Sequence, residues 1–335
     1  MGKILAGKNE SGFYYESGTY GVISGATQWI GLVQNFAPSD SQNIQRLRYH
    51  GTSSRNWGKS INGVESYGGN VEYYPQDLKF AMFALGSIYD QSGTALGGVY
   101  NHAISELPSC IPNTMTTLPG SPFMSFGLVS TQECNAANSL TRTYGGCMVD
   151  NWTIAKSDNS SPISCNFDYV AQSLAFTSGV LTGATEPSRN PMIPSESVVY
   201  LPSGTQMDAK TWSFSVANNI DRDGAYVSNG SRTIKQPTPT ERDYTFDMTM
   251  DAESSEAARL YGKWKSGGDI SINAGLLINH LGGTSGANWF SMSGCIIDSF
   301  DAPNPVEGID EWSLSIIPKT VQISAADTTE KYSGW

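Results

Sequence analysis

The chain is poor in charge, and poorest in positive charge. Its 335 residues include 20 Lys and Arg against 31 Asp and Glu, and charged residues make up 15% of the total, below the roughly 25% of average soluble domains. Because electrostatic binding of phosphates requires a basic surface, a net charge of −11 argues against nucleic-acid binding. No stretch approaches the roughly 18 apolar residues of a membrane span. The segment from Met1 to Glu10 turns polar too soon for a signal peptide. We therefore predict no membrane partner.

Cysteine and histidine are also scarce. The 5 cysteines are odd in number and widely spaced, which favours free thiols over a disulfide framework. No Cys-x-x-Cys pair or His/Cys cluster indicates zinc. His50, His102 and His280 are far apart and accompany no Gly-x-Ser-x-Gly elbow. Acid pairs such as Asp298 with Asp301 are more typical of charged turns than of glycoside hydrolysis. The prediction is a protein that is not an enzyme and has no cofactor or catalytic metal.

Two motifs come close to known ligand sites and fail. Gly58–Ser60 has the Gly-Lys-Ser end of a phosphate-binding loop, but Ser53 occupies the position of the required earlier glycine. Asn219–Gly224 has the spacing of a calcium loop, but Gly230 stands where a bidentate glutamate is needed. A turn rich in Asx residues explains the second motif better, and weak calcium binding near Asp221 and Asp223 stays open.

Many short strands are predicted. With 35 Gly and 16 Pro the chain has many turns, and 39% hydrophobic residues are enough for packed cores. Alternation of apolar and polar residues predicts strands at Trp29–Asn35, Asn70–Tyr74, Tyr144–Asp150, Cys165–Val170, Trp212–Asn218, Tyr244–Asp251, Met292–Asp298 and Trp312–Ile317.

Two helices are predicted from apolar stripes. One follows Pro75, a favoured first helical residue, and ends at Gly86. The second begins near Asp251 or Ser254 and ends at Gly267. Their stripes are formed by Leu78, Ala81, Met82 and Leu85, and by Ala257, Leu260, Tyr261 and Trp264.

The second half of the chain repeats the order of predicted elements of the first half, which indicates an internal duplication. Gly146–Asp150 and Gly294–Asp298 both read Gly-Cys-x-x-Asp, and 148 residues separate Cys147 from Cys295. The two predicted helices are offset by 176 residues, so the first half carries about 28 extra residues, which we place within positions 89–120. Both cysteines are predicted to be small buried packing residues.

Several segments resemble phage major tail tube proteins. They are Glu16–Gly21, Gly146–Ile154, Asn166–Ala171, Asn218–Asn219, Gly230–Arg232 and Tyr244–Asp251. The resemblance implies a mainly β fold with a few helices (β-rich α+β), built of tail-tube-like β-sandwich or half-barrel modules. We expect two tandem modules at 13–181 and 211–325, each with one packed helix, and an extended proline-rich connector at 182–210.

The resemblance also implies an assembly. Such proteins form rings that stack into the hollow tail through which the genome passes. A duplicated chain implies homotrimeric, pseudo-six-fold rings, with a homohexamer as the alternative. The implied partners are further copies of the chain, a tape-measure protein and tail terminator or tip proteins, and viral DNA passes without specific binding. The implied location is the virion tail, with the host cytoplasm during assembly.

Two sets of residues are candidates for this role. An acidic lumen repels DNA phosphates, and the strand alternation points to Asn70, Glu72, Thr245, Asp247, Thr249 and Asp251 as its lining. The alternative is an ordinary amphipathic strand that faces bulk solvent. For contacts with the next subunit or ring, where arginine is favoured, the candidates are Arg46, Arg48, Arg55, Arg232 and Arg242. The alternative for these is a solvated loop.

Another class of function remains open. A β-sandwich binding module, such as a capsid decoration or a receptor- or carbohydrate-binding protein, would use exposed aromatic residues. Trp57, Trp152 and Trp289 are the candidates. A tube protein must instead avoid polymerising too early, and we expect residues 1–12 and 326–335 to order only on assembly. Removal of residues 1–12 is then expected to weaken stacking and leave the modules folded.

Overall fold

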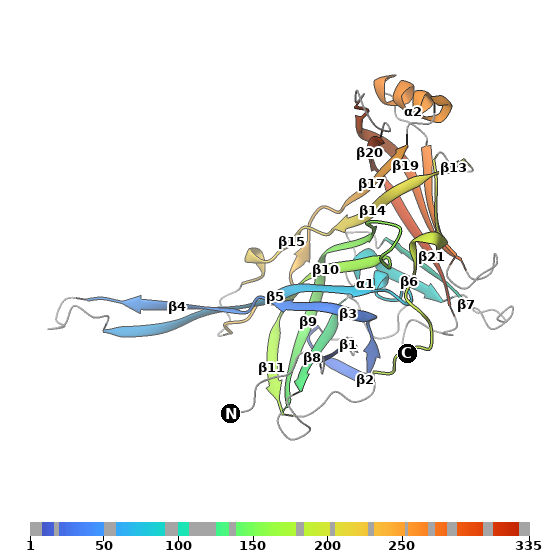
Figure 1. Ribbon diagram of the computed structural model, residues 1–335. Helices are drawn as coiled ribbons and strands as arrows, with labels where there is room; N and C mark the ends of the chain where they lie inside the picture. The colour runs from blue at the N-terminus through green and yellow to red at the C-terminus, as the bar shows by residue number, and fades with distance from the viewer. Residues whose placement is uncertain are drawn as a thin grey trace.

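The structure is a computed structural model (Figure 1). It describes residues 9–16, 20–49, 58–90, 100–106, 125–133, 139–178, 184–201, 205–226, 231–251, 254–266, 272–279, 287–303 and 311–327. Most of them lie in antiparallel strands, which confirms the β-rich α+β prediction. Among them no helix is long and apolar enough to cross a membrane.

One long antiparallel sheet runs through both halves of the chain. Eight strands follow one another in it, each paired with the next. In spatial order they are β3 (Leu32–Pro38), β5 (Lys59–Tyr74), β10 (Ser164–Ala171), β9 (Ser139–Lys156), β14 (Ala209–Ala217), β17 (Asp243–Asp251), β20 (Glu311–Ile317) and β19 (Asn288–Asp301).

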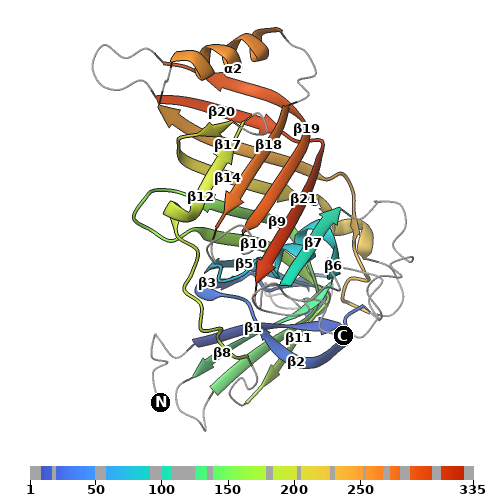
Figure 2. The same cartoon turned by 90° about the vertical axis from the view of Figure 1, so that its right-hand side faces the viewer.

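Two further sheets share β9 and β19 with the long sheet. In Figure 2 the sheet with β1, β2 and β8 lies at the bottom, and the sheet with β18, β19 and β21 lies above it. In the first half the order is β2 (Ile23–Trp29), β1 (Asn9–Glu16), β8 (Phe126–Glu133), β9 and β11 (Ser173–Thr177). In the second half it is β13 (Gln206–Met207), β12 (Ser197–Tyr200), β18 (Ile272–Ile278), β19, β21 (Thr320–Asp327), β7 (Tyr100–Glu106) and β6 (Gly86–Asp90).

The remaining elements are short, apart from one arm and one helix. β4 (Ser41–Leu47) pairs with the first part of β5, and this hairpin projects away from the body as an arm (Figure 1). α2 (Ser254–Ser266) lies beside the far end of the long sheet. The others are α1 (Ala81–Leu85), β15 (Ile220–Asp221), β16 (Thr238–Pro239) and the 3-10 turns η1 (Pro194–Glu196) and η2 (Asp223–Ala225).

The strand pairing of the first half is repeated in the second. In both halves the Gly-Cys strand (β9, β19) crosses from an outer sheet into the long sheet. In the first half β9 pairs there with β10, β10 with β5, and β5 with β3. In the second half β19 pairs with β20, β20 with β17, and β17 with β14. In the outer sheets β8 corresponds to β18, β1 to β12 and β11 to β21.

Local irregularities coincide as well. Gly146 and Gly294 are left-handed, with φ of 66° and 63°. The thiols that follow them are buried, as predicted, and each approaches the carbonyl three residues earlier: Cys147 Sγ lies 3.7 Å from Tyr144 O, and Cys295 Sγ lies 3.5 Å from Met292 O. Asp150 and Asp298 are the residues skipped at the next register shift. Because a bulge and a left-handed glycine are specific backbone features, their repetition at a spacing of 148 supports a duplication.

Replacing each of these glycines with alanine gives a matched pair of variants. Each carries a penalty of roughly 1–2 kcal/mol for the left-handed conformation. At Gly146 the added Cβ also meets Gln172 Cβ and Tyr20 Cζ at 2.8 Å, whereas at Gly294 only Lys319 is near, at 3.0 Å. We expect G146A to lower the urea midpoint of unfolding more than G294A, and equal shifts would contradict the packing at Gly146.

A buried carboxylate links the N-terminal motif to the Gly-Cys strand. Glu16 Oε1 accepts a hydrogen bond from Gly146 N at 2.7 Å, and Oε2 accepts from Gly21 N at 3.1 Å and from the Ser125 hydroxyl. Burial raises the pKa of Glu16 above its usual 4.5. The folded state therefore favours the neutral carboxyl, and the free energy of unfolding falls as the pH rises from 4.5 toward the raised pKa.

Two predicted elements are divided or shortened in the structure. The single strand predicted at 29–35 is divided into β2 and β3 at Gly31, whose φ is 137°. The helix predicted from Pro75 is only α1, from Ala81, although Gly86 ends it in the left-handed conformation as predicted. α2 has the predicted extent. Of its predicted stripe, Leu260 is buried and the rings of Tyr261 and Trp264 contact Phe300 of β19, although Tyr261 is 41% exposed. The side chain of Ala257 is not among those described.

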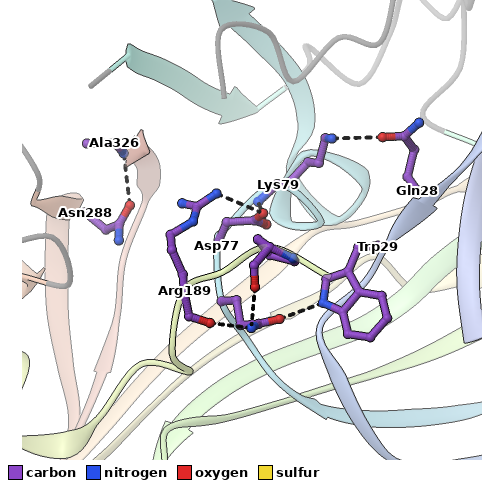
Figure 3. Close-up of polar contacts among 9 residues, drawn as sticks. Gln28, Trp29, Asp77, Lys79, Arg189, Asn288 and Ala326 are labelled. Carbon is purple, nitrogen blue, oxygen red and sulfur yellow. Dashed lines mark hydrogen bonds and ion pairs between the residues drawn. The ribbon is translucent and has the colours of Figure 1, made fainter. Parts of the chain in front are cut away.

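The predicted connector is fixed to both halves. Gln76 donates to Arg189 O and accepts from Trp29 Nε1, and Arg189 lies 3.9 Å from Asp77 (Figure 3). Further along, β12 pairs with β18 of the second half. The boundaries 13–181, 182–210 and 211–325 stay a prediction.

Parts of the predicted insertion and termini lie in strands. Of positions 89–120, the described residues are the end of β6 and all of β7, and β7 pairs with β21 of the second half. Residues 1–8 and 328–335 lie outside the described residues, but 9–12 belong to β1 and 326–327 to β21. Residues 9–12 are thus already ordered in the single chain, and Gly12 is buried and pairs with Val129. Removing residues 1–12 would take away this part of β1, and the expectation that the modules stay folded remains a prediction. A truncation that tests stacking must stop at residue 8.

Candidate functional site: the polar face and free edges of the long sheet

All six residues predicted to line a lumen lie on one face of the long sheet. Asn70 and Asp168 are ladder partners, as are Asp247 and Ser315, and both pairs are hydrogen-bonded through their side chains, at 2.8 and 2.6 Å. Glu72, Thr245, Thr249 and Asp251 follow at alternate positions of the same strands. The opposite face forms the core, with Phe167, Trp152, Phe214 and Phe246 all buried.

This polar face is acidic. Its ladder positions carry seven carboxylates, Glu72, Asp168, Asp243, Asp247, Asp251, Asp301 and Glu311, and a bulge in β14 carries Lys210. Lys210 Nζ lies 2.6 Å from Asp251 Oδ1 and also contacts Glu311. Hydrogen bonds to these two carboxylates raise the pKa of Lys210, so the one cation is already neutralised within the face.

The face is hollowed over the second half. A depression of about 530 Å³ is lined mainly by hydroxyls and carboxylates, among them Thr211, Ser213, Asp247, Asp301 and Ser313. In the part of the chain that the structure describes, no three His, Cys, Asp or Glu side chains are grouped to hold a metal ion. Asp247 and Asp301 give this depression negative charge, which disfavours phosphate, although Lys156 is also among its lining residues.

Among the described residues, the long sheet has two edges that lack a further strand partner. One is β3, and the other is the C-terminal part of β19, which pairs with β20 on one side only. Inside the chain the equivalents of these strands, β14 and β9, are paired with each other, with Ser215 opposite Thr153 and Ala217 opposite Asn151. The sequence pattern missed these edges, because neither the order of the strands nor the junction is visible in local alternation.

Comparison with known families decides the identity. Residues 13–280, well over half of the chain, match the family model described as phage tail tube protein. The chain belongs to this family. It is therefore a structural component of a phage tail that self-assembles into a tube and is located in the virion tail. The comparison with curated proteins gives no match.

In this tail tube protein the predicted interface arginines occupy different environments. Arg46 and Arg48 are exposed on the arm, whereas Arg55 lies outside the described residues. Arg232 pairs with Glu65 of the first half at 2.7 Å. Arg242 donates to Asn218 Oδ1 at 2.7 Å and to Leu85 O at 2.8 Å, so its guanidinium joins the two halves of one chain.

The aromatic residues proposed for a binding module do not form an exposed set. Trp152 is buried at the junction of the halves, so its assignment as an exposed loop residue is wrong. Trp289 is half-buried and packs beside Tyr200, and Trp57 lies outside the described residues. The tail tube protein therefore presents, among the described residues, no aromatic platform built from these three.

The near-calcium segment is a turn with internal partners. Asp221 Oδ1 accepts a hydrogen bond from Gly224 N at 2.9 Å, a local contact of an Asp side chain with the backbone three residues on. Asn219, at φ 45°, donates to Asp243 Oδ2 and to Glu241 O. These contacts explain the Asx residues of the motif without a bound ion. His102 is buried in β7, and His50 and His280 lie outside the described residues.

Proposed function

We propose that three copies of this chain close a ring in which β19 of one copy pairs with β3 of the next, and that such rings stack into a tube around an acidic lumen that conducts DNA. The observation that carries the proposal is the β9–β14 junction inside the chain. Since β19 corresponds to β9 and β3 to β14, each chain contains one complete junction between modules and the two unpaired halves of another.

Ring closure also removes the sheet edges through which the protein could aggregate. Open sheet edges present unpaired N–H and C=O groups to any other strand and promote aggregation. Pairing β19 with β3 of a neighbouring copy leaves the long sheet without an edge. The contact is heterologous, since a different surface of each copy takes part, and such contacts close into rings.

The size of the closed sheet suits a conduit. Three chains bring together 24 strands, eight from each. At a spacing of about 4.8 Å, 24 strands form a ring about 37 Å across, and a wider one when the strands tilt. Six modules then surround the axis, which is the pseudo-six-fold arrangement.

The proposal places the polar face inside. The core face is already covered by the two outer sheets, so the face with Asn70, Glu72, Thr245, Asp247, Thr249 and Asp251 is the one left to line the lumen. Seven carboxylates at its ladder positions against one neutralised lysine repel the DNA backbone and let it slide. Division of the chain into modules at 13–181 and 211–325 belongs to the same proposal.

Other partners follow from position in a tail. A tube needs a tape-measure protein within it and terminator or tip proteins at its ends, and its subunits are made in the host cytoplasm before assembly. These partners are part of the proposal. Arg46 and Arg48 are both exposed on the arm, and of the two we place Arg46 in the contact between copies.

Negative-stain electron microscopy of concentrated protein tests the proposal. We expect hollow rings or tubes whose averaged end views show three copies, each contributing two similar densities. Six identical copies per ring would retain the tube and overturn the trimer. Closed oligomers that never stack would contradict the tube.

A further inference from the structure

Within each chain, one loop of the second half folds over the polar face of the first. Asn218 N donates to Asp150 O at 2.7 Å, and Ile220 N donates to Asp150 Oδ1 at 2.9 Å. Arg222 then donates to Tyr67 O at 2.9 Å. The bulged Asp150 thus accepts hydrogen bonds from two backbone N–H groups of the loop.

The same loop packs on one member of a buried apolar pair. Met148 and Val170 are ladder partners on the polar face, where side chains would otherwise meet water. Both are buried, at 7% and 8% exposure, and Val170 packs in a small cluster with Ala225 and Ile234 of the loop. The loop therefore removes apolar surface from the polar face of the first half.

The equivalent place in the second half is open. Ile296 and Ile317 are ladder partners that correspond to Met148 and Val170. They are 49% and 43% exposed. Asp298, the bulged counterpart of Asp150, is exposed as well. An apolar pair beside a carboxylate thus lacks, among the described residues of its own chain, the cover that its counterpart has.

The arm has the sequence and length of the covering loop. Gln42–Arg46 reads Gln-Asn-Ile-Gln-Arg, and Asn218–Arg222 reads Asn-Asn-Ile-Asp-Arg. Both segments leave the sheet at corresponding ladder pairs, Ser41 with Ser66 and Ala217 with Asp243, so their lengths differ by one residue.

Their conformations differ for a physical reason. The loop follows β14, which lies beside β9, so the first half is within its reach. The arm follows β3, whose neighbouring strand is missing in the single chain. The arm consequently projects from the body (Figure 1), and Ile44 is 51% exposed.

We propose that the arm of one copy docks on the second half of the neighbouring copy as the loop docks on the first half of its own chain. Ile44 N then donates to Asp298 of the neighbouring copy, Arg46 donates to the neighbouring copy's Tyr244 O, and the arm covers Ile296 and Ile317. The partner is thus the adjacent copy within a ring, which rests on the ring closure proposed above. Burial of exposed isoleucines on both sides and one charged hydrogen bond favour the contact.

Cysteine cross-linking tests the contact. Chains with Ile44→Cys are mixed with chains with Asp298→Cys under assembly conditions, all with Cys110→Ser and Cys134→Ser, and are oxidised mildly. The expected product is a disulfide-linked pair of the two different chains. Chains with Ile44→Cys mixed with chains with Asp150→Cys are the matched control and should remain unlinked, because Ile220 already occupies Asp150.

A second pair of variants tests the same contact without introduced cysteines. Arg46→Ala should raise the protein concentration required for assembly by about tenfold, the effect of losing one charged hydrogen bond. Arg48→Ala should leave it unchanged, since its counterpart in the loop is Gly224, which has no side chain to donate.

The outcomes separate this contact from the tube itself. Rings or tubes that form without the Ile44–Asp298 link, with equal effects of the two arginine variants, overturn arm docking and leave the proposed function in place. Failure of the unsubstituted chain to form rings contradicts the ring, and arm docking with it.

Discussion

Chains that carry Ser39→Cys together with Asp301→Cys should become linked into covalent trimers when assembled protein is oxidised. The register comes from the internal junction, where Ser215 lies opposite Thr153. The repeat offset of 176 residues relates β14 to β3, so Ser215 corresponds to Ser39. The offset of 148 residues relates β9 to β19, so Thr153 corresponds to Asp301. Antiparallel ladder partners have Cα atoms about 4.5–5.5 Å apart, which is within the range of a disulfide. Denaturing gels should therefore change from monomer alone to a ladder that ends at three.

The control uses the junction that exists in every chain. Thr153→Cys with Ser215→Cys should form a disulfide within one chain, so its denatured mass stays that of the monomer. Cys110 and Cys134 are serine in all these variants, and Cys147, Cys165 and Cys295 are buried. A ladder that ends at six would overturn the trimer, and assembled tubes without any cross-link would overturn β19–β3 pairing.

Replacement of Trp152 with alanine should cause the largest loss of stability of any single substitution considered. The indole is buried at the junction, with Phe167 of the first half and Val216 of the second as its ladder partners. Its ring also meets Phe214 edge to face, with centroids 6.2 Å apart. Removing a buried tryptophan costs about 3–5 kcal/mol, because the cavity collapses only in part. Chemical denaturation measures the change in the free energy of unfolding.

Trp289→Ala is the matched control. Trp289 is half-buried and packs on Tyr200 near the outer sheet, away from the junction. Its loss should be the smaller of the two. A Trp152→Ala protein as stable as wild type would show that the halves are not held together through this residue.

Local sequence predicted most elements and their faces. Alternation in residues 244–251 was sufficient to place Phe246 in the core and Asp247 on the polar face, because strand side chains alternate with a period of two. It failed where backbone geometry intervened. Gly31 divides β2 from β3 through a positive φ, and α1 begins six residues after Pro75 because residues 76–80 form turns around the contacts of Gln76 and Asp77.

The sequence by itself determined the β-rich class, the polar and apolar faces, and the repeated Gly-Cys-x-x-Asp strand, since each depends on neighbouring residues or on direct repetition. Only the tertiary structure decided which strands pair. It placed β14 beside β9, took β7 from the first half into the sheet of the second, buried Trp152 at the junction, and placed Arg242 across it. These features depend on contacts between residues more than fifty positions apart. Local periodicity carries no information about them, because the same alternating strand fits beside many partners until the whole sheet is formed.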